Sequence, residues 1–337
     1  MKHRPADGIQ RQSGFLAAAP AYLLTAAVVV CAVFAFAPRS HPPAPVTTIH
    51  PNGLLVTGLA QRGSHWLAAG EQGRILIADN AEGPWREAKV APQRASNFTS
   101  VLFIDDQVAL AAGHDSWIVR SEDGGQTWTE VSFDPERSEP LLGISGPFNG
   151  MLYAYGGFGQ FQTSSDGGKT WQRVTHEALG DKHLNAMTQL GDGTLVIVGE
   201  RGLMATSCDA GLSWAALPEI YPGSFFGALA LKDNGLLVYG MRGNAFVTQD
   251  RQTWIQSALP EPVSMFGGTV DDDGQLVLVG ENGSVLRSSD GGQHFRLAVG
   301  GARQRLATVL PVEGDGWLVA GESGIAVKRP AVSGAAS

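Results

Sequence analysis

Short apolar runs that end in glycine recur along most of the chain. They are WLAAG, VALAAG, MLYAYG, TLVIVG, LLVYG, LVLVG and WLVAG. Their glycines are 43, 43, 43, 41, 40 and 41 residues apart and are Gly70, Gly113, Gly156, Gly199, Gly240, Gly280 and Gly321. A period of this length is typical of four-stranded propeller blades. The pattern therefore predicts an all-β fold, a seven-bladed β-propeller.

Turn residues divide each repeat into four strands. An apolar first strand, such as 98–104 or 225–231, is followed by a turn rich in Asp and Gly and by the second strand that ends at the serial glycine. The segments GEQG, GERG, GMRG, GENG and GESG come next. They predict two-residue hairpin turns in which glycine supplies a positive φ. A third strand and an outer fourth strand complete the unit.

Two further series of residues recur along the chain with nearly the same spacing. Small residues recur in the first strands, where strands converging on an axis leave little room: Gly58, Ser100, Gly143, Ala186, Gly227, Gly267 and Ala307. Aromatic residues close the units: Trp85, Trp128, Trp171, Trp214, Trp254 and Phe295. There are only six of these aromatic residues for seven repeats, so the last repeat has no fourth strand of its own. We expect 46–50, VTTIH, to supply it by pairing with the last strand and closing the ring.

The amino-terminal segment is different in kind. Residues 15–37 are 23 apolar positions without a charge, enough to span a bilayer, and Lys2, Arg4 and Arg11 precede them. Basic residues before a span keep that end in the cytoplasm. The sequence thus predicts a cytoplasmic tail (1–14), a transmembrane signal anchor (15–37), a proline-rich linker (38–45), a periplasmic propeller (46–330) and a disordered tail (331–337). Retention of the anchor and cleavage as a signal peptide both stay open, although Pro38 disfavours cleavage after Ala37.

Composition narrows the class of partner. Without its first 37 residues the chain has 21 basic and 31 acidic residues, which argues against nucleic-acid binding. The histidines are too scattered to predict a metal site, and the glycines lie in strand-to-strand turns rather than in a phosphate-binding loop. We expect no cofactor, no metal and no catalytic residue.

An acidic, glycine-rich motif lies between the third and fourth strands, as in SEDGGQTW and SSDGGKTW. This motif resembles the Asp-box, or bacterial neuraminidase repeat, which in that family is a structural hairpin. Its Asp can accept hydrogen bonds from turn amides while its Trp packs between sheets. A calcium site would need more oxygen ligands. The structural set is Ser121, Asp123, Trp128, Ser164, Asp166, Trp171, Ser207, Asp209, Trp214, Ser288, Asp290 and Phe295.

The name of the motif raises a sialidase-like glycosidase as an alternative. Such enzymes use three arginines, a tyrosine nucleophile paired with glutamate and an acidic proton donor, usually on six blades. Here no acid and nucleophile pair can be identified, and Tyr153, Tyr155 and Tyr239 fall in second strands, where they are expected to be core residues.

The full unit, as in LVLVGENGSVLRSSDGGQHF, is similar to that of the photosystem II stability and assembly factor family of seven-bladed propellers. Some bacterial relatives are encoded beside transporters of the resistance, nodulation and division superfamily. The resemblance implies a non-enzymatic propeller that binds an integral inner-membrane protein, as an accessory subunit of such a transporter or, alternatively, as a transient assembly factor.

A partner would meet the face formed by the turns between strands two and three and by the connections between blades, opposite the Asp-boxes. Arginines on an acidic domain suit carboxylate or polar backbone groups of a partner, although single surface arginines are often only solvated. The candidates for partner binding are Arg201, Arg242, Arg94, Arg137, Arg303, Arg305, Phe158 and Tyr221.

Overall fold

The computed structural model describes residues 14–36, 51–271 and 273–330. The chain divides into two compact units, Met1–Thr47 and Thr48–Ser337. The first contains the helix α1, Gly14–Phe36. Within the described residues, no helix combines the length and the apolarity needed to cross a membrane.

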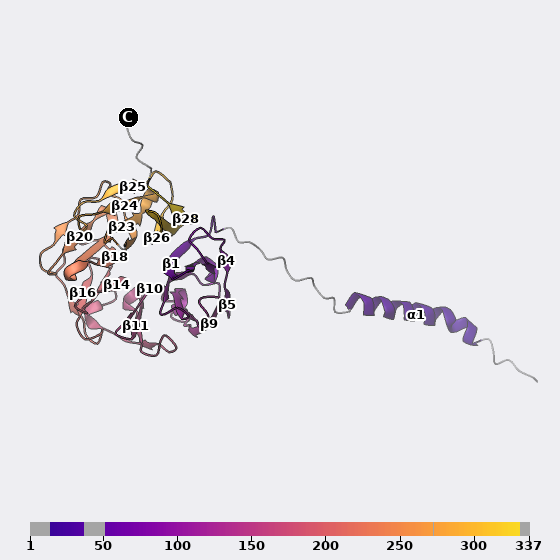
Figure 1. The fold of residues 1–337 in the computed structure, drawn as a ribbon. Coiled ribbons are helices and arrows are strands. Elements are labelled where there is room, and N and C mark those ends of the chain that lie inside the picture. Colours follow the sequence, from indigo (N-terminus) through magenta and orange to yellow (C-terminus); the bar gives the residue numbers. More distant parts are fainter. Residues whose placement is uncertain (1–13, 37–50, 272, 331–337) are drawn as a thin grey trace, which may run out of the picture. The chain divides into compact units, whose positions relative to one another are not determined.

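The second unit is a ring of seven antiparallel sheets (Figure 1). The first two sheets are β1 Val56–Arg62, β2 His65–Gly70, β3 Ile75–Ala78 and β4 Arg86–Glu87; and β6 Phe98–Phe103, β7 Ala109–Gly113, β8 Ile118–Ser121 and β9 Thr127–Ser132, with β5 Lys89–Ala91 added in parallel to β9. The third and fourth are β10 Leu141–Phe148, β11 Met151–Gly156, β12 Phe161–Ser164 and β13 Gln172–Arg173; and β14 Leu184–Gln189, β15 Leu195–Gly199, β16 Met204–Ser207 and β17 Ala215–Ala216.

The remaining strands complete the ring. They are β18 Phe225–Ala230, β19 Leu236–Gly240, β20 Ala245–Thr248 and β21 Ile255–Gln256; β22 Met265–Val270, β23 Leu276–Gly280, β24 Val285–Ser288 and β25 Arg296–Val299; and β26 Leu306–Val312, β27 Gly316–Gly321 and β28 Gly324–Lys328. Short 3₁₀ turns are η1 Glu71–Gly73, η2 His114–Ser116, η3 Gly157–Gly159, η4 Glu177–Leu179, η5 Lys232–Asn234, η6 Met241–Gly243 and η7 Glu281–Gly283. The seven-bladed all-β prediction is confirmed.

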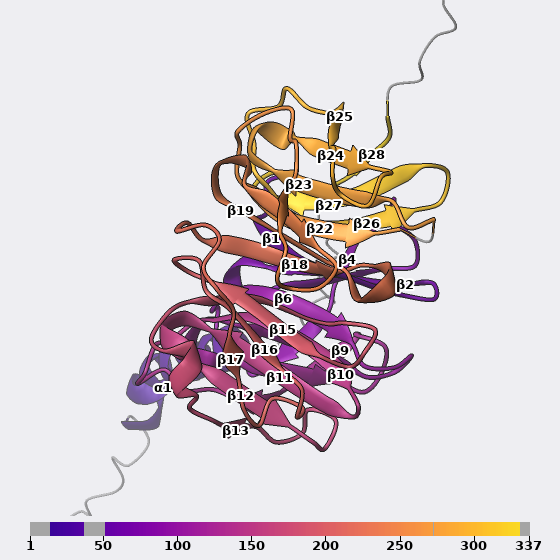
Figure 2. The same ribbon diagram turned by 90° about the vertical axis from the view of Figure 1, so that its left-hand side faces the viewer.

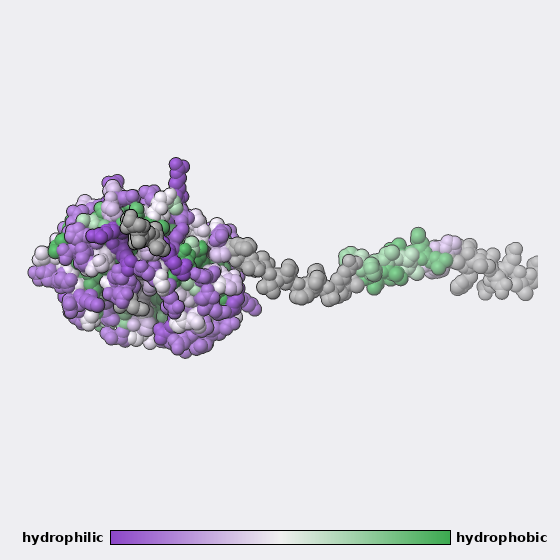
Figure 3. Space-filling view, turned by 45° about the horizontal axis from the view of Figure 1, so that its top comes forward, coloured by the Kyte–Doolittle hydropathy of each residue, from purple (hydrophilic) through white to green (hydrophobic). Residues whose placement is uncertain are grey.

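The hydrophobic core lies between the blades rather than at one centre. Each cluster of buried side chains combines residues of neighbouring sheets, as Trp66 of β2 does with Leu318 of β27 and Ile325 of β28. This cluster also joins the last blade to the first and so completes the ring. Figure 2 shows the sheets stacked edge-on around the ring, and Figure 3 shows one side of the propeller covered largely by hydrophilic residues.

The innermost strands carry the recurring small residues predicted from the sequence, except that one of the predicted positions, in β26, was wrong. Every first strand has a β-bulge near its start, and the residue after the bulge is Gly58 in β1 and Gly267 in β22. A Cβ at Gly267 would meet the backbone of Thr308 in the next blade, which shows how closely the inner strands approach. In β26 the position after the bulge is Thr308, and Ala307 is the bulged residue. The prediction of Ala307 for this register was therefore wrong by one residue.

The serial glycines have a common physical reason. Gly156 has φ −174°, an extended backbone open to any residue. A Cβ there would overlap the carbonyl oxygen of Pro140, which precedes the first strand of the same blade. The same overlap with the residue before the first strand occurs at the other six: Gly70, Gly113, Gly199, Gly240, Gly280 and Gly321. Close approach, not a left-handed φ, explains why glycine recurs at this position.

The turns after these glycines are one residue longer than predicted in six blades. Gly240 N–H donates to Asn244 O, which leaves three residues between the paired ends. The predicted two-residue turn occurs in the last blade, where Gly321 pairs with Gly324. In the longer turns the middle residue is left-handed, with φ 50° at Arg201 and 56° at Arg242. Arg201 and Arg242 are both exposed at this position.

The longer turns lie on the same face as the connections between blades, as predicted. Gly159 N–H donates to Lys182 O, and Gly202 N–H donates to Gly223 O. Each acceptor belongs to the connection that enters the next blade. These bonds fix the turns and the connections as one surface, which we call the turn face.

The last sheet has three strands among the described residues. The segment 46–50, predicted to supply its outer strand, lies outside the described residues. The chain is described again from Pro51, and Gly53 N–H donates to Ser323 O at 3.4 Å.

Candidate partner-binding face

The Asp-boxes are hydrogen-bonded turns, as predicted. Ser121 Oγ donates to Asp123 Oδ1 at 2.8 Å and accepts from Gly125 N–H at 2.9 Å. Asp123 Oδ1 also accepts from Thr127 N–H at 2.9 Å, and the Trp128 indole N–H donates to Gly125 O at 2.8 Å. The carboxylate is thus occupied by groups of its own loop, which gives it a structural role.

The same arrangement recurs around the ring. The serine-to-aspartate bond is 2.8 Å at Ser164 and Asp166, 2.7 Å at Ser207 and Asp209, and 2.8 Å at Ser288 and Asp290. The shortened copy keeps it too, since Thr248 Oγ1 donates to Asp250 Oδ1 at 3.1 Å. In each of these copies the aspartate carboxylate is hydrogen-bonded within its own loop.

These bonds lower the pKa of the Asp-box carboxyls and make stability depend on acid pH. The Ser213 hydroxyl and backbone lower the pKa of Asp209 to about 2, and the Thr253 amide lowers the pKa of Asp250 to about 2. Because the folded-state pKa of these carboxyls lies below the ordinary aspartate pKa of 3.8, the stabilisation is present above about pH 4 and is lost as pH falls towards 2. We expect the urea midpoint to fall steeply between these pH values. The fall should be shallower in Asp250→Asn and unchanged in Asp181→Asn, an exposed control; equal slopes in all three proteins would contradict this role.

Two predicted arginines meet at one hollow on the turn face. Arg201, Tyr221 and Arg242 line a hollow of about 390 Å³ together with Glu200, Pro222, Gly223, Ser224 and Met241. Both arginines hold the left-handed position of their turns, in adjacent blades. The Arg201 side chain is 74% exposed and its Nε lies 3.2 Å from Glu200 Oε1. Arg242 is exposed and has no ion pair within the described residues.

Tyr221 is the floor of this hollow rather than an exposed aromatic. Its ring packs against Phe225 and Phe246, with centroids 5.9 and 6.2 Å away, and it is only partly exposed. Its hydroxyl lies 3.5 Å from Met241 O. This packing holds the Tyr221 ring in place in the lining of the hollow.

The other predicted residues are spread around the ring. Arg94 is bound to Glu130 by two contacts of 2.9 Å and covers the Phe133 ring at 4.3 Å. Arg137 lies 3.3 Å from Asp134, and Arg305 lies 3.6 Å from Glu322. Six arginines therefore do not form one cluster.

Two predicted residues stay exposed away from the hollow. Phe158 is 61% exposed, with its ring edge against His183 at 5.1 Å. Arg303 is exposed and has no ion pair in the described part of the chain. Neither shares a described pocket with Arg201 and Arg242.

Comparison with known proteins agrees with this architecture. A model of the BNR/Asp-box repeat matches residues 162–173. The chain carries a BNR/Asp-box repeat. A search of curated protein sequences gave no match.

Solved propellers share the fold at low sequence identity. YCF48 bound to D1 peptide is 18% identical with a TM-score of 0.68, covering 87% of this chain and 99% of that chain. YCF48 from Cyanidioschyzon merolae is 17% identical with a TM-score of 0.66, covering 84% and 97%. Streptogramin B lyase is 12% identical with a TM-score of 0.69, covering 84% and 95%. The similarity to YCF48 supports, at the level of the fold, the resemblance found from the repeats.

The tyrosines of the second strands are core residues, as expected. Tyr153 is fully buried, and burial raises the pKa of Tyr155 and of Tyr239 above the ordinary value. Tyr155 and Tyr239 fill the space beside Gly143 and Gly227 of the inner strands.

Among the described residues, no three His, Cys, Asp or Glu side chains are grouped to hold a metal ion.

One residue of the site was missed from the sequence. Glu200 lies in the wall of the hollow and accepts a 3.2 Å hydrogen bond from His183 N–H, at the entry to its own blade. Glu281 and Glu322 accept equivalent bonds from Ser264 and Arg305 N–H. The sequence feature that could have indicated this role is the glutamate that follows the serial glycine in GERG, GENG and GESG.

Proposed function

We propose that this chain is a non-enzymatic recognition propeller that binds a segment of an integral membrane protein at the hollow between Arg201 and Arg242. The observation that carries the proposal is that two exposed arginines from adjacent blades and the Tyr221 ring line one hollow. Tyrosine and arginine are among the side chains that contribute most to the affinity of protein interfaces. The hollow contains Arg201 paired with Glu200, and Arg242 without an ion pair among the described residues, so it keeps a net positive charge on an acidic domain. Such a site suits carboxylate or carbonyl oxygens of a partner.

A related propeller supports the choice of partner. YCF48 has been observed bound to D1 peptide, and its chain is covered almost completely by this one. A shared fold does not transfer a ligand, but it shows that a propeller of this type can hold a peptide. We therefore propose an assembly factor for a membrane complex; the accessory subunit of a transporter is the competing role.

The uncharged apolar sequence of residues 15–37 is the basis for proposing a membrane tether. Tyr22, Leu23 and Leu24 are about 70% exposed in α1, and three basic residues precede it in the sequence. We propose that α1 anchors the chain at the outer side of the bacterial inner membrane, with the propeller in the periplasm. A tether raises the effective concentration of the propeller near its client, so weak contacts suffice.

Reversing both arginines should abolish partner capture. We expect Arg201→Glu/Arg242→Glu to lower recovery of the membrane partner from detergent-solubilised membranes by about tenfold or more, because two attractive contacts become repulsive. Thermal unfolding should be unchanged, since both side chains are exposed. The measurement is affinity purification with quantification of the protein that travels with the full chain.

The control is Lys89→Glu/Lys169→Glu, which makes the same change of net charge at exposed positions outside the hollow. Equal recovery with the two double variants would eliminate the hollow as the binding site. A stoichiometric complex would favour a transporter subunit, whereas recovery only with newly made client would favour an assembly factor.

A further inference from the structure

Phe158 occupies a backbone position that is unusual for its side chain. It is the middle residue of its turn, with φ 57° and ψ 38°, a left-handed conformation that is rare for bulky residues. Phe158 is also 61% exposed. The same position in the other longer turns is held by polar residues: Gln72, Asp115, Arg201, Arg242 and Asn282. Neither the backbone conformation nor burial favours phenylalanine here, and strained positions of this kind cluster at functional sites.

The turn that carries Phe158 is held against the connection into the next blade. Gly159 N–H donates to Lys182 O at 2.8 Å. A Cβ at Gly159 would overlap Gly180 O, which shows how closely the turn and the connection approach. The Phe158 ring meets His183 of this connection edge-on, with ring centroids 5.1 Å apart. The exposed ring therefore has a fixed place on the turn face.

The same connection joins Phe158 to the hollow at Arg201 and Arg242. His183 O accepts a 2.9 Å hydrogen bond from Glu200 N–H, and Glu200 lies in the wall of the hollow. Phe158, Arg201 and Arg242 hold the same turn position in three successive blades. A partner segment that extends along the turn face from the hollow to the preceding blade therefore meets Phe158.

The charges beside Phe158 differ from those of the hollow. Asp181 and Lys182 both lie in the connection that contacts the Phe158 turn, so neither sign of charge dominates there. Lys182 Nζ donates to Arg201 O at 3.4 Å, on the side of the hollow. The hollow itself has an excess of positive charge, because Arg242 has no ion pair among the described residues. The turn face thus matches carboxylates at the hollow and an uncharged apolar side chain at Phe158.

We propose that Phe158 is a second contact for the partner segment that binds the hollow, and that this segment combines carboxylates with one bulky apolar side chain. The partner is that of the proposed function, on which this inference rests. Its carboxylates accept hydrogen bonds from Arg201 and Arg242, while its apolar side chain packs on the exposed ring of Phe158. The first contact is electrostatic and the second buries apolar surface, so salt weakens only the first.

Peptide binding tests the second contact. The probes are two fluorescein-labelled peptides of twelve residues with two aspartates at one end and one phenylalanine at the other, in the two possible orders. They are titrated with the full chain in detergent and followed by anisotropy. We expect saturable binding of one order at least, and about tenfold weaker binding when alanine replaces the phenylalanine. Phe158→Asn should cause the same loss for the phenylalanine peptide and none for the alanine peptide, because the two rings contact each other.

The substitution by asparagine keeps the fold. Asparagine tolerates a left-handed backbone and is present at the equivalent position as Asn282. Phe158→Asn should therefore unfold at no lower temperature than the unaltered chain. Gln72→Asn, at the same turn position in the first blade, is the matched control and should bind the peptide unchanged. In about 0.5 M NaCl the effect of Phe158→Asn should persist, whereas that of Arg201→Glu/Arg242→Glu should shrink.

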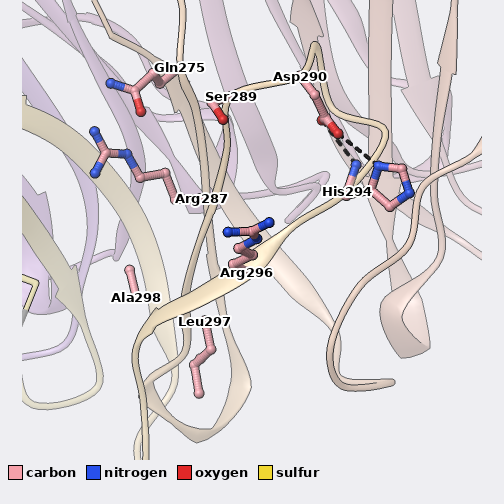
Figure 4. A pocket seen from close by; sticks show the side chains of 8 residues that line it. All are labelled: Gln275, Arg287, Ser289, Asp290, His294, Arg296, Leu297 and Ala298. Carbon is pink, nitrogen blue, oxygen red and sulfur yellow. Dashed lines mark hydrogen bonds and ion pairs between the residues drawn. The ribbon is translucent and has the colours of Figure 1, made fainter. Parts of the chain in front are cut away.

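A second hollow with two arginines provides the control for charge. It has a volume of about 610 Å³, and Figure 4 shows Arg287 and Arg296 in its lining, which contains no Phe, Tyr or Trp. Arg296 is exposed and has no ion pair in the described part of the chain. Arg296→Glu should leave peptide binding unchanged. A loss as large as that of Arg242→Glu would mean that the peptide binds any exposed arginine, and would overturn the inference.

The remaining outcomes separate this inference from the proposed function. If Arg201→Glu/Arg242→Glu weakens binding and Phe158→Asn does not, the hollow stands and the second contact is wrong. If only Phe158→Asn weakens binding, the proposed function at the hollow fails while Phe158 stays an apolar contact. No saturable binding of either peptide, or tighter binding of a peptide with lysine in place of phenylalanine, would overturn the inference.

Discussion

Replacing Gly156 with alanine is expected to lower the free energy of unfolding by about 3 kcal/mol, because the new methyl group overlaps backbone rather than a movable side chain. The Cβ would meet Pro140 O and Leu141 Cα at the start of the first strand of the same blade. Gly157 N–H donates to Pro140 O at 2.9 Å, so relief of the overlap also disturbs this bond. Urea unfolding followed by tryptophan fluorescence measures the loss.

Gly167→Ala is the matched control for this substitution. Gly167 has φ +73° and nothing within 4 Å of an added Cβ, so alanine there carries only the strain of a left-handed backbone. That strain costs about 1 kcal/mol. A loss at Gly156 equal to or smaller than that at Gly167 would show that close approach is not the reason for the serial glycines.

The number of blades could be predicted from the sequence because every blade makes the same close backbone contacts and therefore repeats the same residue types. The serial glycine recurs wherever the second strand passes the entry of its own blade, and the aromatic closure recurs wherever an Asp-box packs between sheets. Local details escaped because they depend on backbone geometry. The extra residue in the turns adopts a left-handed backbone, and the small-residue position of the last blade falls on Thr308 rather than Ala307 because of a β-bulge. Neither feature changes the spacing of about 41 residues from which the blades were predicted.

The candidate site was predicted in part for the same reason. Arg201 and Arg242 occupy one repeated turn position, so their shared face followed from the period. Their shared hollow did not, because it depends on how the connection 218–224 folds Tyr221 beneath them. Arg94 shows the opposite case, since the partner that holds its guanidinium, Glu130, is far away in sequence and could not be inferred from the repeat.

Replacing Trp128 with alanine is expected to lower the free energy of unfolding by about 4 kcal/mol, the typical cost of truncating a buried tryptophan. Trp128 is 1% exposed and belongs to the cluster between the first two blades, with Leu67 and Val119. The substitution removes this packing and also the 2.8 Å bond from its indole N–H to Gly125 O. Calorimetry or urea unfolding of the full chain measures the effect.

Substitution by phenylalanine separates the hydrogen bond from the packing. Trp214 is buried like Trp128, but its indole N–H has no hydrogen-bond partner among the described residues. Trp128→Phe should therefore lose about 1 kcal/mol more than Trp214→Phe, because only the first variant breaks a bond and leaves Gly125 O without its donor. Equal losses in the two variants would mean that the tryptophan stabilises its blade by packing alone, and that the Asp-box turn is held by Ser121 and Asp123 without it.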